Sequence, residues 1–144
     1  MAVGGYTTDL ERGDRLGPVE YTLSPFVVRE YSHAVELHHD IFQRAKAGIM
    51  PPTLIHLDKL RLYRHACPKG TGPSARVHIE YDATFHHPVH VGERLRVGGV
   101  VSDRYEKRGR EYVHIDMELH RVSDNTLLIS YRDTVILSYS GKSA

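Results

Sequence analysis

The sequence predicts a single α+β domain in which an antiparallel sheet of about five strands wraps around one central buried helix. First, apolar residues of segment 53–66 spread around much of a helical circumference, which is typical of a buried helix. Second, apolar and polar residues alternate along 75–85 and 111–121, as in antiparallel strands with one face in water. Third, one short strand and three helices are followed by about four long strands, an order that suits such a sheet.

The first half of the chain is expected to be mostly helical. After a turn at Gly13-Asp14, a strand and three helices are expected at Arg15–Leu23, Phe26–Glu36, Asp40–Ala47 and Thr53–Ala66. Ser24 and Pro25 suit the N-cap and first position of the first helix, because Ser accepts from free N–H groups and Pro has none. Gly48 suits the end of the second helix. The apolar positions expected on the first and third helices are Val27, Tyr31, Ala34 and Val35, and Leu54, Ile55, Leu57, Leu60, Leu62 and Tyr63.

The second half is expected to form strands. They are predicted over Ala75–Phe85, Arg94–Val101, Glu111–Arg121 and Leu127–Leu137, with turns at Arg108-Gly109 and Asp124-Asn125. In 75–85 the odd positions should face the core, and in 111–121 the inward residues should be Val113, Ile115, Met117 and Leu119. Because an open sheet edge invites pairing, two such sheets are expected to pair in a dimer.

Composition narrows the class of protein. The 144 residues fit one domain, 1–144, with frayed ends expected over about 1–10 and 140–144. A net charge of +1 gives no electrostatic case for nucleic acid or an anionic membrane as partner. No run reaches the roughly 18 apolar residues that span a bilayer, and the first residues lack a signal-peptide pattern. The single Cys67 excludes an internal disulfide and fits a reducing compartment, so a cytoplasmic protein is expected.

Three stretches of the chain carry motifs: Gly13-Asp14, the segment 85–95 (FHHPVHVGERL) and the segment 101–113 (VSDRYEKRGREYV). They resemble the MaoC-like dehydratase and hydratase family, in which the second stretch is similar to "pv.vGd.l" and the third to the hairpin "v.d.yekrGr.yv". The resemblance covers Arg12 to Leu137 and implies a hot-dog domain, in which the sheet wraps the helix. It also implies an acyl thioester substrate, carried by CoA or by acyl carrier protein. Members hydrate enoyl thioesters or dehydrate hydroxyacyl thioesters without metal or cofactor, so we expect neither here.

The sequence departs from the family in the active-site segment. The hydratase pattern there is close to Y-A-x-A-x-x-D-x-N-P-x-H, in which the Asp and the His work on one water. Aligned on Tyr31 and Ala34, this chain has Leu37 at the Asp position and Phe42 at the His position. Neither side chain can transfer a proton. The chain therefore resembles the degenerate N-terminal-type MaoC domains, in which a partner hot-dog unit carries the Asp/His pair.

Acids and imidazoles nevertheless occur together in this segment, at Glu36, His38, His39 and Asp40. His38 or His39 could act as general base toward water, with Glu36 or Asp40 orienting it or returning the proton. Alternatively, the histidines are exposed loop residues and Asp40 caps the short helix. Both interpretations remain open from the sequence alone.

Two further segments are candidates for binding the substrate. Met50-Pro51-Pro52-Thr53-Leu54 resembles the degenerate subgroup's "aP-T-f" and replaces the hydratase's "H-G-M". In the hydratase a backbone N–H at the start of the buried helix polarises the thioester carbonyl. Since proline has no N–H, this role would pass to Thr53 or Leu54. The basic turn around Arg108 could meet the phosphates of CoA or of a carrier-protein arm, or could be a solvated hairpin tip; it contains Arg104, Lys107, Arg108 and Arg110.

Other reactive residues are weaker candidates for a functional site. His86, His87 and His90 could be metal ligands, but they occupy a predicted loop without partner cysteines, so hydrogen-bonded or solvated histidines are expected. Cys67 lies at the predicted end of the buried helix, where the helix dipole raises the pKa of a thiol.

We therefore expect a hydratase or dehydratase of enoyl or hydroxyacyl thioesters with a non-standard acid/base set. The alternative is a non-catalytic acyl-binding subunit that pairs with a catalytic hot-dog chain, so the chain should form a homodimer or a heterodimer. A third, less favoured interpretation is a thioesterase, in which a carboxylate activates water against the carbonyl.

Overall fold

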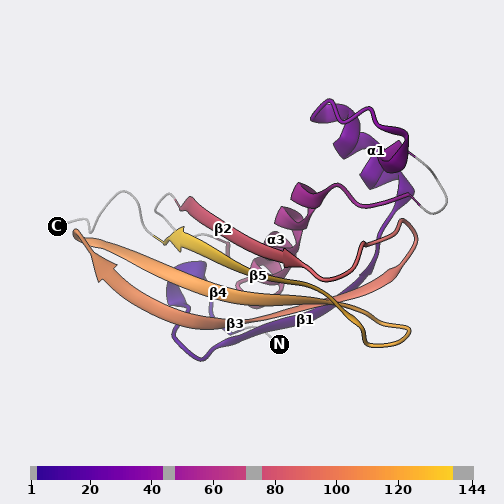
Figure 1. Ribbon diagram of the computed structural model, residues 1–144. Helices are drawn as coiled ribbons and strands as arrows, with labels where there is room; N and C mark the ends of the chain where they lie inside the picture. Colours follow the sequence, from indigo (N-terminus) through magenta and orange to yellow (C-terminus); the bar gives the residue numbers. More distant parts are fainter. Residues whose placement is uncertain (1–2, 44–47, 71–75, 138–144) are drawn as a thin grey trace.

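The computed structural model describes residues 3–43, 48–70 and 76–137. Within these ranges the chain forms one antiparallel sheet with the strand order β1-β3-β4-β5-β2. The strands are β1 (Arg15–Thr22), β2 (Val77–Phe85), β3 (Arg94–Lys107), β4 (Arg110–Arg121) and β5 (Leu127–Ile136). The helices are η1 (Thr7–Asp9), α1 (Pro25–Ala34), α2 (Asp40–Gln43), η2 (Pro52–Ile55) and α3 (His56–Ala66). The sheet curves around α3, which confirms the predicted α+β architecture (Figure 1).

The alternating pattern of β4 correctly predicts which residues face the core. Its inward residues Val113, Ile115, Met117 and Leu119 are all buried. The turn between β3 and β4 is the predicted Arg108-Gly109, where both residues have positive φ, 52° and 75°. Positive φ angles at both central residues are typical of a type I′ hairpin turn, whose twist matches that of the flanking strands.

The same rule fails at β2, which lies at an edge of the sheet. Tyr81 and Ala83 pack against the core as predicted. Ile79 and Phe85, expected to face inward, are 49% and 46% exposed. The pairing of β2 with β5 shifts register between His78 and Glu80, and the outer side of an edge strand has no neighbouring strand to cover it. β2 therefore presents an open edge with two exposed apolar side chains.

The central helix is less apolar than predicted. It begins as the 3₁₀ turn η2 and becomes α-helical only at His56. Leu54, Ile55, Leu62 and Tyr63 are buried as predicted. Leu60 is instead 46% exposed, whereas Asp58 and Lys59 are buried. The sheet-facing side of α3 thus carries charged groups, which must find partners inside the molecule.

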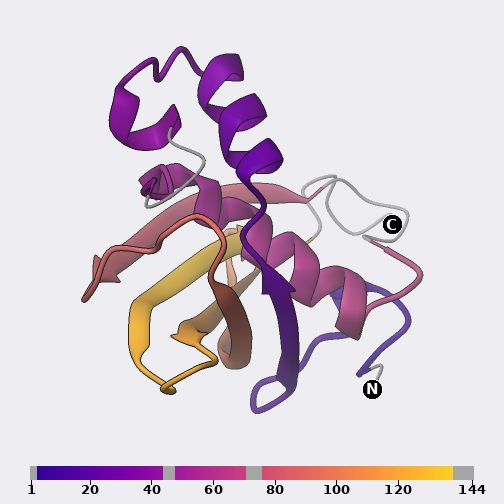
Figure 2. The same ribbon diagram turned by 90° about the vertical axis from the view of Figure 1, so that its right-hand side faces the viewer.

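The first helix begins as the sequence predicts but buries a different face. The Ser24 hydroxyl accepts a hydrogen bond from the Val27 N–H (3.5 Å), with Pro25 at the first helical position. The buried residues are Val28 and Ser32. Of the face expected to be buried, Val27 and Tyr31 are only half-buried, and Ala34 and Val35 are exposed. α1 stands clear of the sheet, as the turned view shows (Figure 2), so a single chain leaves much of it uncovered.

α1 and α2 together, residues 25–43, form a projection that we call the arm (Figures 1 and 2). α2 is observed over Asp40–Gln43, and the rest of the helix predicted to Ala47 lies outside the described residues.

The N-terminal segment is packed rather than frayed. Leu10 and Thr7 are buried, and the Val3 N–H donates to the Ala66 carbonyl at 2.9 Å. Arg104 of β3 donates to the Thr8 carbonyl (3.0 Å) and to the Leu10 carbonyl. The expectation of a frayed end over 1–10 is therefore wrong for residues 3–10, while residues 140–144 lie outside the described part. Among the described helices, none has the length and apolar character needed to cross a membrane.

Candidate functional site

The end of α1 turns sharply at Glu36. The Glu36 N–H donates to the His33 carbonyl at 3.2 Å. The next N–H, that of Leu37, donates to the Ser32 carbonyl at 2.8 Å, and Glu36 has a φ of 59°. This is the Schellman arrangement that closes many helices, with a glutamate in the position that glycine usually occupies. The turn directs the following residues toward α2.

The four residues predicted to act in catalysis are all exposed at this end of the arm: Glu36, His38, His39 and Asp40. The His38 ring lies 5.9 Å from the ring of His33, and the His39 ring lies 6.0 Å from that of Phe42. Within the part of the chain that the structure describes, no hydrogen bond or ion pair joins an imidazole of this group to a carboxylate. The structure thus places the four residues near one another without arranging any two as an acid/base pair.

The start of α3 is tied to the arm. The Tyr31 hydroxyl of α1 shares a hydrogen bond with the Thr53 hydroxyl of η2. The Leu54 N–H donates to the Pro51 carbonyl at 3.0 Å, so it is not free to polarise a ligand. The Thr53 N–H has no hydrogen-bond partner among the described residues. Of the two residues predicted to offer a backbone donor, only Thr53 therefore retains one.

Arg108 lies far from this region. It occupies the β3–β4 hairpin tip, at the opposite end of the sheet from the arm (Figure 1), and its side chain is exposed. The neighbouring Arg104 forms ion pairs with Glu11 (3.3 Å) and Glu111 (3.0 Å). The structure therefore does not bring the predicted phosphate-binding turn and the predicted catalytic cluster together.

Sequence reasoning missed a buried polar network between α3 and the sheet, centred on Asp58. The hydroxyl of Tyr21 donates to Asp58 Oδ1 at 2.6 Å, and that of Tyr131 donates to Oδ2 at 3.3 Å. Arg61 forms an ion pair with the same carboxylate at 2.7 Å. Burial raises the pKa of Asp58, and the hydrogen bonds oppose this rise. Four residues from three elements thus hold one another in place.

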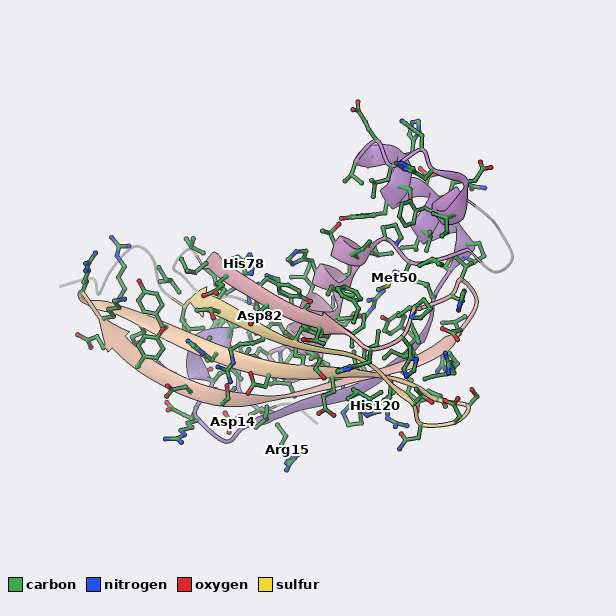
Figure 3. The ribbon with its side chains drawn as sticks, in the orientation of Figure 1. Asp14, Arg15, Met50, His78, Asp82 and His120 are labelled. Carbon is green, nitrogen blue, oxygen red and sulfur yellow. The ribbon has the colours of Figure 1, made fainter. Side chains whose placement is uncertain are left out.

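A second buried carboxylate, Asp133 of β5, lies near the first. Lys59 reaches Asp133 Oδ1 at 3.3 Å, and the Tyr63 hydroxyl donates to Oδ2 at 3.2 Å. His78 Nε2 lies 2.9 Å from Oδ1. Figure 3 shows His78 at the start of β2, away from the arm, whereas Met50 lies close to the arm. This carboxylate–imidazole contact is therefore separate from the predicted catalytic cluster.

Aromatic rings extend this network toward the open edge of the sheet. The His56 ring lies 4.4 Å from that of Tyr81 and 5.5 Å from that of His78. Burial lowers the pKa of His56, and the nearby Lys59 lowers it further. The Tyr81 hydroxyl is buried without a hydrogen-bond partner. No sequence motif predicts this group of residues, because they come from α3 and β2 and come into contact only in the folded chain.

The remaining candidates stay apart from these groups. His86 Nε2 lies 3.0 Å from the Ser130 hydroxyl. Across the described ranges, no three His, Cys, Asp or Glu side chains gather as metal ligands would. Cys67 is buried, and burial raises the pKa of its thiol to about 11.

Comparison with known proteins identifies the fold. The sequence matches no protein-family model and no curated protein. The HadBC complex of Mycobacterium tuberculosis, a 3R-hydroxyacyl-ACP dehydratase, superposes with a TM-score of 0.72 at 20% identity, over 87% of this chain and 96% of that one. The (R)-hydratase of A. caviae involved in PHA biosynthesis gives 0.69 at 16% identity, over 90% and 98%. The MaoC-like dehydratase of Rhodospirillum rubrum gives 0.68 at 12% identity, over 92% and 96%.

These structures share the sheet that curves around a central helix, and they match the described chain over nearly its full length. The likeness confirms the fold predicted from the sequence resemblance. The chain therefore has the hot-dog fold of the MaoC-like dehydratases and hydratases.

Proposed function

We propose that this chain is the acyl-binding subunit of a heteromeric hydratase or dehydratase of acyl thioesters, in which a partner hot-dog chain supplies the catalytic Asp and His. The observation that carries the proposal is that, aligned on Tyr31 and Ala34, the chain has Leu37 and Phe42 where the family's hydratase pattern has that pair. Their polar neighbours in the arm offer no paired replacement.

Hydration of an enoyl thioester needs a general base and a general acid held toward the same water. Such groups are usually buried and hydrogen-bonded, because a fixed orientation and a shifted pKa make them effective. Here the residues His38 and His39 are exposed, and among the described residues neither imidazole forms a hydrogen bond or ion pair with Glu36 or Asp40. This arrangement supports a binding subunit better than a complete active site.

The open edge of the sheet supports pairing with a second chain. β2 exposes Ile79 and Phe85 beside a backbone edge that has no neighbouring strand. A matching strand would satisfy the free backbone groups and cover both side chains. The HadBC dehydratase, which shares the fold, is a complex by its description. A heterodimer is therefore the assembly that we propose, with a homodimer as the alternative.

The substrate proposal is an acyl thioester carried by CoA or by acyl carrier protein. The free Thr53 N–H at the start of the central helix is the group best placed to donate to the thioester carbonyl. A helix N-terminus favours developing negative charge, so this donor would be strengthened by its position.

A second candidate is that the chain catalyses hydration alone. The Tyr31–Thr53 hydrogen bond favours it, because it fixes the arm against the start of α3. His38 and His39 follow Tyr31 by seven and eight residues, so a rearrangement of this segment could bring an imidazole toward a thioester held at Thr53.

The two candidates are separated by assaying crotonyl-CoA hydration with the purified chain alone and with a co-expressed hot-dog chain that has the Asp/His pair. We expect no turnover by the chain alone, and turnover by the pair above that of the catalytic chain alone. Thr53→Pro, which removes the N–H, should reduce the activity of the pair, whereas Thr53→Ser, which keeps both the N–H and a hydroxyl, should retain most of it. Turnover by the chain alone that is abolished in His39→Ala or Asp40→Ala would establish the second candidate instead.

A further inference from the structure

A cavity of about 560 Å³ lies along α3, from Leu57 near the start of the helix to Cys67 at its end, and its described lining includes no residue of the arm. It is bounded by α3, the N-terminal segment and the residue that precedes β2. The described lining comprises three arginines, one hydroxyl and mainly apolar side chains, and it includes no carboxylate: Thr7, Leu57, Leu60, Arg61, Tyr63, Arg64, Cys67, Pro68, Gly70 and Arg76. The charged side chains of the described lining are therefore all cationic.

Two of the three guanidinium groups are not neutralised. Arg61 is paired with Asp58. Arg76 and Arg64 form no ion pair with any described residue. Arg76 stacks over the Tyr63 ring, 4.1 Å from its centroid, and its Nη1 is buried without a hydrogen-bond partner in the described part of the chain. A buried donor on a cation is costly to leave unpaired, which points to a ligand that accepts from it.

A second buried polar group without a hydrogen-bond partner among the described residues lines the same cavity. Thr7 is only 1% exposed, and its hydroxyl oxygen has no hydrogen-bond partner. Native structures leave few buried polar atoms unpaired. Thr7 and Arg76 are 69 residues apart in the sequence, so the occurrence of both unpartnered atoms beside one cavity is an independent sign of an absent acceptor.

The end of α3 does not account for these arginines. Cations often lie near a helix C-terminus because they complement its free carbonyl groups. Here the Ala66 carbonyl accepts from the N–H groups of Val3 (2.9 Å) and Gly4 (3.2 Å). The Tyr63 carbonyl accepts from the Cys67 N–H at 2.7 Å. Backbone N–H groups thus already satisfy two carbonyls of the last turn, those of Tyr63 and Ala66.

We infer that this cavity binds a phosphate group. Two unpaired guanidinium groups and a hydroxyl offer donors in more directions than the two oxygens of a carboxylate can meet, whereas a phosphate dianion has three free oxygens and the matching charge. The apolar walls formed by Leu57, Leu60 and Pro68 leave room beside the phosphate for an organic group. The ligand is a free phosphate ion or a small phosphate ester, and the site is separate from the acyl-binding region proposed above.

Calorimetric titration of the full chain with inorganic phosphate and with ADP tests the inference. We expect saturable binding that Arg76→Gln weakens about tenfold or more, the loss of a charged hydrogen bond. Arg64→Gln should weaken it as well, and because Arg64 is exposed this variant should keep the fold. Arg29→Gln, which removes an exposed arginine from α1, is the matched control and should bind as the wild type does.

The two probes distinguish the sources of the phosphate. Tighter binding of ADP than of inorganic phosphate would identify a phosphate ester, and the reverse order a free ion. The inference is overturned if the wild-type chain binds neither probe saturably. It is also overturned if Arg64→Gln and a folded Arg76→Gln bind as the wild type does, or if Arg29→Gln loses as much affinity as they do. If Arg76→Gln does not fold, the comparison of Arg64→Gln with Arg29→Gln decides.

Discussion

The hydroxyl of Tyr21 on β1 donates a 2.6 Å hydrogen bond to Oδ1 of Asp58, a carboxylate that is fully buried on α3. The bond joins an edge strand to the central helix. It also compensates part of the cost of burying the carboxylate, which Arg61 and Tyr131 compensate from other directions. The position of α3 on the sheet therefore depends on polar contacts as well as on apolar packing.

Tyr21→Phe should lower the free energy of unfolding by about 1.5 to 3 kcal/mol, because it removes a hydrogen bond to a buried charged group. Urea denaturation measures the change. Tyr112→Phe is the control, since the Tyr112 ring stacks on Tyr105 and its hydroxyl has no hydrogen-bond partner among the described residues. Equal losses in the two variants would contradict the role assigned to the Tyr21–Asp58 bond.

Glu36→Gly should raise the free energy of unfolding by about 0.5 to 1 kcal/mol, because Glu36 closes α1 in a left-handed conformation that glycine adopts without strain. Glu30→Gly, at an exposed position inside the same helix, should lower it by a similar amount. Thermal and urea unfolding measure the change in the free energy of unfolding for both variants. A loss of stability in Glu36→Gly would show that its side chain contributes to the fold.

His56 should make stability depend on pH in the mildly acidic range. Burial lowers its pKa below the ordinary value of 6.5, so the unfolded chain binds this proton more readily than the folded chain. The free energy of unfolding should therefore rise with pH up to about 6.5 and gain nothing more from this group at higher pH. Urea denaturation at a series of pH values should show a shallower rise for His56→Gln than for the wild type. An unchanged slope would be evidence against a lowered pKa of this partly buried imidazole.

Arg104→Gln should release the N-terminal segment. Arg104 donates to two carbonyls of that segment and pairs with Glu11 and Glu111, so its loss should cost about 1.5 to 3 kcal/mol. Hydrogen exchange should become faster at the Leu10 N–H, which donates to the Thr7 carbonyl. Arg108→Gln, on the same hairpin but exposed, should change stability by less than about 0.5 kcal/mol. Slow exchange at Leu10 in Arg104→Gln would contradict this anchoring.

Local chemistry explains what the sequence could predict. The alternation of β4 identifies its core face because one side of the sheet is buried along the whole strand. The start of α1 is predictable because Ser24 acts on an N–H three residues away. Neither feature depends on contacts that are distant in the sequence.

The features of the fold that the sequence did not predict depend on residues that come into contact only after folding. In the sequence, Asp58 and Lys59 are typical of the solvent-exposed side of a helix. They are nevertheless buried, because Tyr21 and Asp133 supply partners from strands that are distant in the sequence. The outward Ile79 follows from the place of β2 at the edge of the sheet, which no local pattern reveals.

The candidate site was predictable to a similar extent. The family resemblance located the segment that carries Glu36 and Asp40 and the start of the central helix, because both lie at fixed places in the pattern. It could not predict that the Leu54 N–H is used within η2, or that the predicted acids and imidazoles lie unpaired in solvent. Their roles depend on a second chain as much as on this one.

The assignment of this chain as a binding subunit is tested by the rate of crotonyl-CoA hydration by the purified chain alone. We expect no turnover above the buffer rate, because Leu37 and Phe42 cannot transfer protons and no acid/base pair replaces them among the described residues of the arm. Turnover by the chain alone that disappears in His39→Ala or Asp40→Ala would contradict it and make this chain the enzyme.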